Sequence, residues 1–493
     1  MMRKRLLVIV ILIMCFNIGF ADDYRGKVNI NDPISVFFSS LYNNPATRKY
    51  LYRKSFWEVN TSFKFDKGNT IVQNGDKSSA FLINTHSYLR KADKLFYGDL
   101  QFKKGKRDNV LWSESSDYEL LGPYVLADLD GGDMNFEEYF FLGGISKQVG
   151  GISYGLEASY RARYEYRLVD PRPRNIVSQF RIKLGSAIDL FESSILGMDI
   201  CYEKYSQQNS IKLFKRDAKQ KIFHMKGFGY YDIMFSKVYG ELMVYHDIQS
   251  WSGSMQYFSK DREGLFTQLS FKKSTLEQDL DKFNDINIFQ LKTNRLKADI
   301  GYSFGKSLLT KIHARLNTRS GFENIYENIS FNNYRRTTVY NNYRSFVCEL
   351  GNSYLFLFYD KKQNIGIDIS YLRDKREYIS SRSLMDISSL NSMISYGFSK
   401  VTFSTDFYVG YSKNLSSRIN LNDMMMAPMV KEEMLIPNYE YLTSDKFLIG
   451  GSVNYKYMFS VDKALFIRGD YKMEYRRTNS LYSNVVITTG ILF

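Results

Sequence analysis

The stretch ISYGLEASYRARYEY, residues 152–166, alternates apolar and polar side chains from its first residue to its last. Successive side chains of a β-strand point to opposite faces, so the alternation predicts a strand with one apolar and one charged face. The stretch is much longer than the roughly 5–6 residues of an ordinary soluble strand. It is long enough to cross a lipid bilayer, which takes roughly 9–11 strand residues.

The same alternation recurs along the chain. It is found at residues 176–190, 296–304, 364–371, 447–459 and 465–476, with weaker copies at 57–65, 265–271 and 401–411. A soluble sandwich with one wet face would also alternate. The length of the segments, their aromatic ends and the charge on the second face favour the membrane instead. We therefore predict an all-β fold, a single transmembrane antiparallel β-barrel of about 16 strands within a range of about 14–18, because bacterial barrels have an even number.

The N-terminus has the features of a secretory signal peptide. Residues 3–5 are basic, residues 6–16 are almost wholly apolar, and small residues precede a predicted cleavage after Ala21. No later run reaches the 18 or so uninterrupted apolar residues of a membrane-spanning helix, which excludes a helical membrane protein.

Three segments follow from this pattern. Residues 1–21 are the predicted signal peptide, and residues 22–54, which are less regular and contain Asn-Asn-Pro-Ala, are predicted to be a periplasmic or lumen-inserted segment. Residues 55–493 are predicted to form the barrel. Phe493 ends a last alternating stretch, and a terminal aromatic residue resembles the signal that outer-membrane assembly machinery recognises.

Composition agrees with this class. The 493 residues include 39 tyrosines and 37 phenylalanines but only 7 prolines, as suits membrane strands with aromatic girdles. The net charge of +15 could indicate nucleic-acid binding, but no DNA- or RNA-binding motif accompanies it. We expect no nucleic acid, and contact with anionic lipid and lipopolysaccharide head groups instead.

Charged residues on the polar faces are the candidate lumen residues. They are Glu157, Arg161, Arg163 and Glu165 in the first stretch, and Arg468, Asp470, Lys472 and Glu474 near the C-terminus. Charges inside a barrel wall need partners. They predict either a salt-bridged, closed lumen or a channel that selects solutes by charge.

Other candidate chemistry is sparse. Asp128, Asp130 and Asp133 cluster with two glycines, as calcium ligands do, but without the closing glutamate of an EF-hand; a sharp turn is the alternative. The four histidines stand in no motif of a nucleophile or activated water. We therefore expect neither an enzyme nor a cofactor.

A family resemblance rests on motifs between residues 122 and 175. These are Gly122-Pro123-Tyr124, Asp128, Gly131-Gly132-Asp133, Glu138-Tyr139-Phe140 and Asp170-Pro171-Arg172-Pro173-Arg174-Asn175. Together they resemble an uncharacterised family of outer-membrane β-barrel proteins of Gram-negative bacteria. The resemblance implies the fold and the outer membrane as location, and no activity.

Two classes of function remain open. The first is a porin-like channel, or an accessory in the transport of a solute across the outer membrane. The second is a structural or accessory barrel for secretion, surface display or a partner uptake receptor; an outer-membrane hydrolase ranks last. Partners would be outer-membrane lipids, the assembly machinery, and an uptake receptor or secretion component.

Overall fold

The structure is a computed structural model that describes most of the chain after residue 32. The described residues are 33–191, 193–214, 222–235, 240–280, 286–305, 307–330, 333–358, 362–400, 402–422, 427–460, 463–477 and 480–493. The predicted signal peptide and its cleavage at Ala21 lie outside the described residues.

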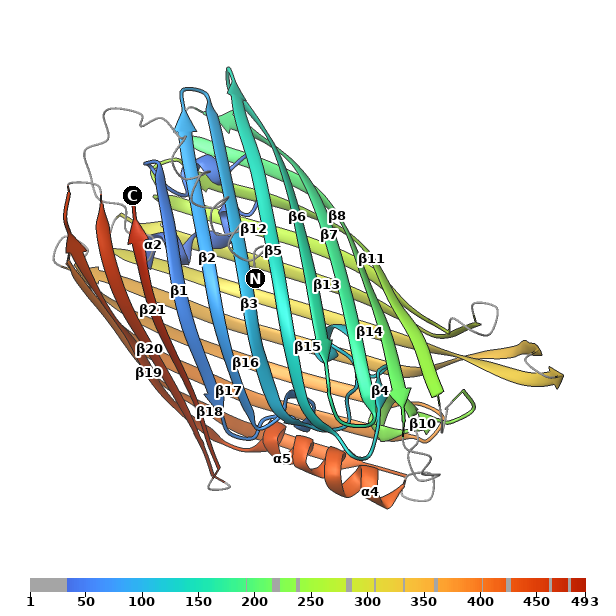
Figure 1. Ribbon diagram of the computed structural model, residues 1–493. Coiled ribbons are helices and arrows are strands. Elements are labelled where there is room, and N and C mark those ends of the chain that lie inside the picture. Colours follow the sequence, from blue (N-terminus) through green and yellow to red (C-terminus); the bar gives the residue numbers. More distant parts are fainter. Residues whose placement is uncertain are drawn as a thin grey trace, which may run out of the picture.

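Eighteen antiparallel strands form one closed barrel (Figure 1). They are β1 (Phe56–Lys67), β2 (Lys77–Lys91), β3 (Lys94–Val110), β5 (Gly132–Val149), β6 (Ile152–Tyr166), β7 (Arg172–Leu190), β8 (Ser194–Leu213), β11 (Gly240–Ser259), β12 (Gly264–Leu280), β13 (Ile286–Phe304), β14 (Leu308–Ser330), β15 (Asn333–Phe358), β16 (Gln363–Tyr378), β17 (Ser383–Ser399), β18 (Phe403–Asn420), β19 (Lys446–Met458), β20 (Ala464–Arg476) and β21 (Leu481–Leu492). Each strand pairs with the next, and β21 closes the barrel on β1. The predicted single antiparallel barrel is confirmed, with 18 strands at the top of the predicted range.

The closing seam ends at Phe493. Its backbone exchanges two hydrogen bonds with Trp57, at 3.1 and 2.8 Å, and the two aromatic rings stack with centroids 5.2 Å apart. The last residue therefore extends the ladder between β21 and β1. Its role as an assembly signal stays a prediction.

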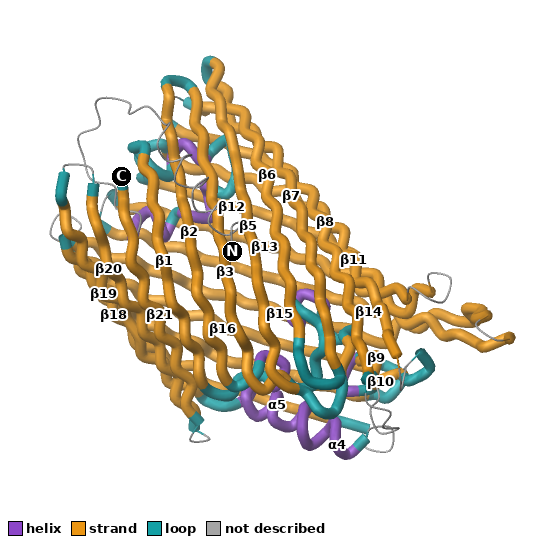
Figure 2. The backbone as a smooth tube through the Cα atoms, in the orientation of Figure 1, coloured by secondary structure: helices purple, strands orange, loops and turns teal. Residues whose placement is uncertain are grey.

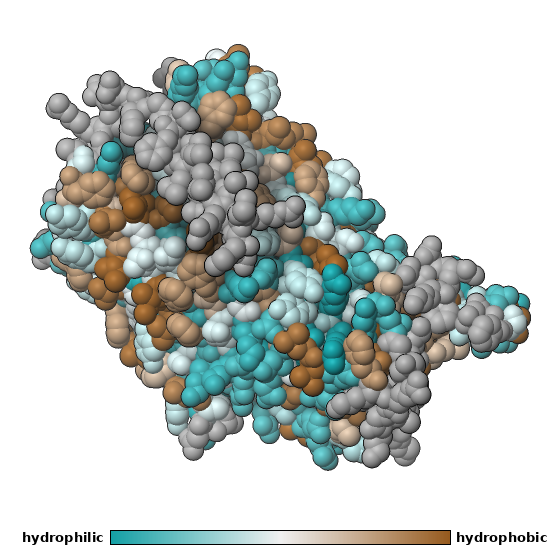
Figure 3. All heavy atoms as spheres, viewed as in Figure 1, coloured by the Kyte–Doolittle hydropathy of each residue, from teal (hydrophilic) through white to brown (hydrophobic). Residues whose placement is uncertain are grey.

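Apolar and polar side chains lie on opposite faces of the barrel wall, as the alternation predicts. Large apolar side chains on the outer face are about half exposed on almost every strand: Phe63, Leu100, Phe141, Leu184, Ile300, Ile312, Leu350, Ile394, Val453, Ile467 and Ile487. Figure 3 shows hydrophobic side chains over the upper part of the wall and hydrophilic ones around its lower end. An apolar surface of this size needs lipid, and a closed barrel leaves no backbone edge unpaired within it. The chain is therefore an outer-membrane β-barrel protein.

The two rims differ in their connections. Short turns such as 92–93, 150–151 and 260–263 join strands at one rim, and longer connections such as 68–76 and 111–131 join them at the other. In outer-membrane barrels the short turns face the periplasm and the long loops face outward. The long hairpin of β14 and β15 extends past the outer rim (Figure 1). Residues 318–330 and 333–340, and residues 374–378 and 383–391, continue the strand pairing of their hairpins.

Short helices lie at both ends of the barrel (Figure 2). At the periplasmic end these are α2 (Pro33–Phe37), η1 (Ser39–Tyr42) and η2 (Arg48–Tyr50). Toward the outside are η3 (Val72–Asn74), α3 (Tyr118–Leu121), η4 (Gly227–Gly229), α4 (Pro428–Val430), η6 (Lys431–Leu435) and α5 (Ile436–Thr443), with a small sheet of β4 (Leu126–Ala127), β9 (Phe223–Met225) and β10 (Tyr231–Asp232). Every helix among the described residues is too short or too polar to cross a bilayer.

These segments form three bodies at the ends of the lumen. We call residues 33–51 the inner plug, residues 111–131 and 222–235 the outer plug, and residues 427–443 the helical cap. The outer plug packs on a buried apolar cluster with the strands around it, and Val430 and Met434 of the helical cap join that cluster. A second cluster, which includes Phe38 and Leu41, seats the inner plug.

Several aromatic rings lie flat against the inner wall over a glycine of a neighbouring strand. A β-carbon at Gly144 would stand 2.1 Å from the Tyr97 ring, and one at Gly490 would stand 2.6 Å from the Phe466 ring. Each ring occupies the space of the missing side chain. The wall therefore carries large aromatic groups without filling the lumen.

Candidate functional site

The charged face of β6 points into the lumen and fastens the outer plug. Arg161 pairs with Asp117 of the outer plug and, at 3.1 Å, with Glu138 of β5. Arg163 lies 3.1 Å from the same Glu138 carboxylate and 3.1 Å from Glu165. The predicted residues of this strand thus meet one another and the plug.

Glu165 is the centre of this network. Its side chain is fully buried, pairs with Arg107 of β3 at 2.5 Å, and accepts a hydrogen bond from the hydroxyl of Ser116 in the outer plug. Further down the strand, Glu157 accepts hydrogen bonds from Tyr97 (3.1 Å) and Arg181 (3.0 Å). On β6, therefore, the charges act as structural ion pairs that hold a plug.

A second buried cluster ties the outer plug to the loop after β6. Arg167, only 1% exposed, pairs with Glu114 at 2.8 Å and with Asp128. Burial raises the pKa of Glu114 well above its usual range, and the Asp128 charge adds to the rise. Burial also acts to raise the pKa of Asp128, but its hydrogen bond with Glu114 and the charge of Arg167 bring it below its usual value. The burial that raises the pKa of Glu114 and the Arg167 charge that lowers the pKa of Asp128 thus act in opposite directions on the two carboxyl groups of this cluster.

The calcium hypothesis for Asp128, Asp130 and Asp133 is not supported by this geometry. Asp128 accepts a hydrogen bond from the backbone of Gly131 at 2.6 Å, which forms the sharp turn. Asp133 pairs with Lys106 at 2.7 Å, and Asp130 is exposed. The carboxylates point to separate partners, and no group of three or more metal-ligating side chains converges within the described residues.

The inner plug is fastened by polar contacts as well as apolar ones. The side-chain amide of Asn44 donates to the carbonyls of Ser186 (3.2 Å) and Met198 (3.0 Å) and to the Gln256 side chain (3.1 Å). These acceptors lie on β7, β8 and β11. The Asn-Pro-Ala segment that stood out in the sequence is therefore where the plug meets the wall.

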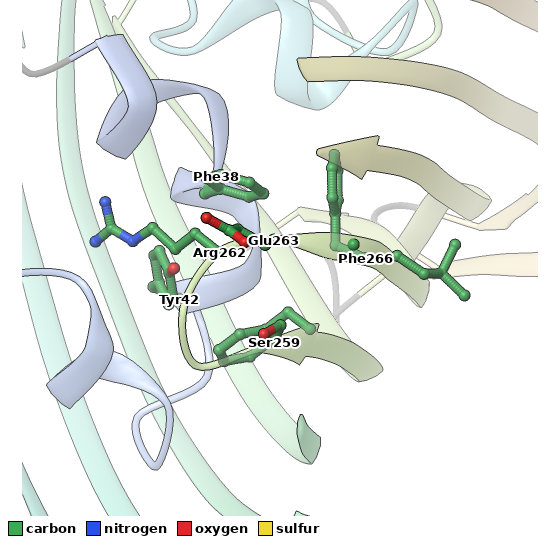
Figure 4. Close-up of a pocket in the computed structure, with 9 residues that line it drawn as sticks. Phe38, Tyr42, Ser259, Arg262, Glu263 and Phe266 are labelled. Atoms are coloured by element: carbon green, nitrogen blue, oxygen red, sulfur yellow. The ribbon is translucent and has the colours of Figure 1, made fainter. Parts of the chain in front are cut away.

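The turn between β11 and β12 holds the other side of the inner plug (Figure 4). The Phe38 and Phe266 rings pack edge to face at 4.8 Å, and the Arg262 guanidinium stands 5.5 Å from the centre of the Tyr42 ring. Arg262 also donates to the carbonyl of Leu51 at 2.8 Å. The small pocket among these residues leaves no room for a ligand, so it is a packing contact.

Lys49 makes the attachment of the inner plug sensitive to pH. Its Nζ donates to Gln148 (2.7 Å) and Ser153 (2.6 Å), and burial lowers its pKa from 10.5 to about 8. Because the docked pKa lies below the undocked one, docking is weakest below pH 8 and strengthens as the pH rises from about 8 to 10.5. The undocked population should fall at most tenfold per pH unit in that window. The measurement is a spin label attached at residue 36, where the native Val36 is 60% exposed. Its spectrum would report the fraction of molecules in which the inner plug is undocked and mobile.

The matched variant Lys49→Met removes the titrating group but keeps a side chain of similar length. In this variant, the fraction of molecules with a mobile inner plug should stay constant from about pH 8 to 10.5. An equal pH response in both proteins would show that another group governs docking.

Both plugs are attached to the same arc of the wall. The contacts described for the inner plug reach from Tyr88 on β2 round to Leu357 on β15. Those of the outer plug reach from β6 to Ser383 at the start of β17, which bonds Tyr230 at 2.9 Å. The remaining arc, from β18 through β21 to β1, carries a different set of features.

The charged face of β20 lines that arc. Arg468 holds Asp470 with two nitrogens, the nearest at 2.6 Å from the carboxylate. Glu474 pairs with Arg476 at 3.0 Å, and Lys472 lies between the two pairs on the same face. These predicted residues bond along their own strand, whereas those of β6 bond to a plug.

A polar cavity of about 260 Å³ opens beside Arg468 and Asp470. Its lining combines two cations, two carboxylates, three amides, two hydroxyls and two apolar side chains: Lys456, Arg468, Glu58, Asp470, Asn60, Asn84, Asn454, Ser62, Thr488, Phe466 and Leu492. They come from both ends of the sequence, which meet where β21 pairs with β1. The cavity is therefore a product of barrel closure.

The helical cap covers the outer end of the same arc. The Tyr441 ring lies under the ammonium of Lys446 at 3.9 Å and the guanidinium of Arg476 at 4.4 Å. At this outer end of the barrel, the side-chain amide of Asn438 donates to the side chain of Gln73 in η3 at 3.0 Å. Polar side chains therefore line this arc from Tyr441 and Arg476 at the cap, along the β20 face, to the cavity, and we call this line of side chains the polar path.

Sequence reasoning missed the residues that complete these sites. Alternation at 447–459 places Asn454 and Lys456 on the polar face, but no local signal joins them to Glu58 or Asn60. Ser116 and Asp117 come from an irregular loop with no periodicity. Their roles depend on contacts between segments far apart in the chain.

The solved structures that the chain matches include receptors and transporters. The ferric preacinetobactin receptor BauA from Acinetobacter baumannii is 7% identical, with 89% of this chain and 80% of that chain covered and a TM-score of 0.47. The siderophore receptor PiuA from the same organism is 6% identical (90% and 82% covered, TM-score 0.43), and the ferric citrate transporter FecA is 8% identical (89% and 79% covered, TM-score 0.39). Identities and TM-scores this low assign no substrate.

Comparison at the level of sequence gives one further result. No curated protein matches the chain. A family of outer-membrane barrels was expected from the motifs between residues 122 and 175. The match to that family's profile covers residues 45–493, and the chain therefore belongs to the family of unknown function DUF6850.

Proposed function

We propose that this protein is a gated channel that carries a small polar solute across the outer membrane. The observation that carries the proposal is the polar path on the arc from β18 to β1, which runs from the helical cap along the β20 face to the cavity. Both plugs are attached to the opposite arc. Displacing the cap alone would then connect the path to the outside.

Tyr441 is one of the contacts through which the helical cap is attached to the barrel, beside Asn438 and the buried Val430 and Met434. A cation–π contact contributes roughly 0.5–2 kcal/mol, so Tyr441→Ala should raise the open fraction about tenfold. The measurement is single-channel recording of the refolded protein in planar bilayers. A variant in which a short Gly-Ser linker replaces residues 427–443 should give long-lived openings.

Two controls separate gating from general damage. Glu440→Ala changes an exposed side chain on the same helix and should leave the recordings as in the wild type. In the cap-less protein, Arg468→Gln should shift the cation-to-anion selectivity, whereas Arg181→Gln, on the plugged arc, should not. A cap-less barrel that stays silent would overturn the proposal and favour a non-transporting accessory barrel.

A further inference from the structure

The cavity beside β20 is built for a ligand without net charge. Its two carboxylates, Glu58 and Asp470, balance its two cations, Lys456 and Arg468. Arg468 is already engaged by Asp470 through a forked contact at 2.6–3.0 Å. An anion or a cation entering the cavity would have to break this pair, so the charges favour a neutral polar occupant.

Side-chain amides form a chain of hydrogen bonds, here called the track, along the cavity wall. Gln101 donates to Asn84 (2.7 Å), Asn84 donates to Asn60 (2.8 Å), and Asn60 donates to Glu58 (2.7 Å). Each carboxamide has two N–H groups and two lone pairs, so each amide in the track keeps both donor and acceptor capacity. Groups that donate and accept at once are the partners that hydroxyl groups need.

Asn454 supplies an unfilled acceptor. Its side chain is 6% exposed, and its Oδ1 has no hydrogen-bond partner among the described residues. A buried acceptor left without a donor is costly, so a ligand hydroxyl that reaches this oxygen after a rotation of the Asn454 side chain would stabilise the site. The two wall hydroxyls of Ser62 and Thr488, which bond each other at 2.9 Å, face the same cavity.

Phe466 adds an apolar platform. Its ring lies over Gly490, where a β-carbon would stand 2.6 Å from the ring, and it lines the cavity. The ring is therefore held close to the wall and offers an apolar surface to the cavity. An aromatic face flanked by amides and hydroxyls matches a molecule with an apolar ring surface and a rim of hydroxyls.

We infer that the cavity binds a small neutral sugar of one or two rings. Its volume of about 260 Å³ lies just below the roughly 300–1,000 Å³ of drug-sized pockets, which limits the occupant to this size. Because the cavity lies on the proposed path, the inference names the class of solute that the channel would carry and so rests on the proposed function.

The test is saturation-transfer NMR on the full-length mature protein in lauryldimethylamine oxide, a detergent without a sugar head group. D-Glucose and sucrose are the probes, with D-gluconate as an anionic and choline as a cationic comparison, since both carry C–H protons that the measurement detects. Glucose or sucrose should give a saturable signal that gluconate and choline do not. Phe466→Ala and Asn454→Leu should each weaken sugar binding by roughly 3- to 10-fold, since each removes one ring or hydrogen-bond contact.

Matched variants keep the result interpretable. Asn391→Leu makes the same exchange on the lumen face of β17, outside the cavity, and should bind sugar as the wild type does. Phe466→Tyr keeps the ring and should retain binding. A gel-shift assay of unheated samples checks that each barrel is folded.

The outcomes separate this inference from the proposed function. No saturable sugar signal, a preference for gluconate or choline, or sugar binding that is unchanged in the Phe466 and Asn454 variants would overturn the inference. A cap-less barrel that conducts ions without binding sugar overturns only the ligand assignment. A barrel that binds sugar through Phe466 but never conducts overturns only the channel.

Discussion

Replacing Arg167 by methionine is expected to destabilise the attachment of the outer plug by about 3–5 kcal/mol, the usual cost of removing one partner from a buried ion pair. Arg167, Glu114 and Asp128 are all 1–2% exposed, so the variant would leave two buried carboxyl groups without the cation that both contact. The variant also loses the hydrogen bond from Arg167 to the Pro171 carbonyl at 2.7 Å.

Limited proteolysis measures this change directly. Residues 111–131 contain the acidic cleavage sites Glu114, Asp117, Glu119, Asp128 and Asp130. A protease that cuts after acidic residues should cleave the Arg167→Met variant at least about a hundredfold faster than the wild type, since each 1.4 kcal/mol corresponds to a factor of ten.

The control lies on the same loop. Arg172 pairs with Asp170 at 2.7 Å, but its guanidinium is 47% exposed, and an exposed pair contributes at most about 1 kcal/mol. Arg172→Met should therefore change the cleavage rate little. Equal rates in the two variants would show that the buried cluster does not hold the plug.

The second large effect is expected at Gly155, on the lumen face of β6. A β-carbon there would stand 2.4 Å from the carbonyl carbon of Pro45 and 2.5 Å from the backbone nitrogen of Ala46. Backbone cannot turn aside as a side chain can, so Gly155→Val should undock the inner plug. An overpacking cost of roughly 1–3 kcal/mol predicts a 5- to 150-fold rise in tryptic cleavage after Arg48 and Lys49.

Gly143 provides the matched exchange. It lies on the adjacent strand β5, and a β-carbon at that position meets nothing within 4 Å. Gly143→Val should leave tryptic cleavage of the inner plug unchanged. A Gly155→Val barrel with a protected plug would mean that the Asn-Pro-Ala segment can dock elsewhere on the wall.

The alternation in the sequence was sufficient to predict the barrel because lipid and lumen impose it on every crossing segment. Residues 318–330 and 333–340 lie where β14 and β15 continue past the rim and both faces meet water, so nothing enforces a period of two there. The closed sheet holds 18 strands, the upper end of the predicted range of about 14–18.

The candidate site was predictable only in part, for a related reason. Faces follow from the pattern, so the inward direction of Arg161 and Arg468 was visible. The pattern does not show which side chains will bond to each other. Asp117 reaches Arg161 from an irregular loop, and Thr488 bonds Ser62, which lies 426 positions away in the sequence. Which charged strand holds a plug and which lines a path depends on these long-range contacts.

The seam between β21 and β1 lies outside the arc to which the described contacts of both plugs are attached. In a curved sheet of β2 to β17, both plugs can therefore bind the concave face before the two edges of the sheet pair with each other. The final rung, between Trp57 and Phe493, then shuts around an interior that is already occupied. If β21 pairs with β1 last, the plugs do not have to be threaded into a barrel that is already closed.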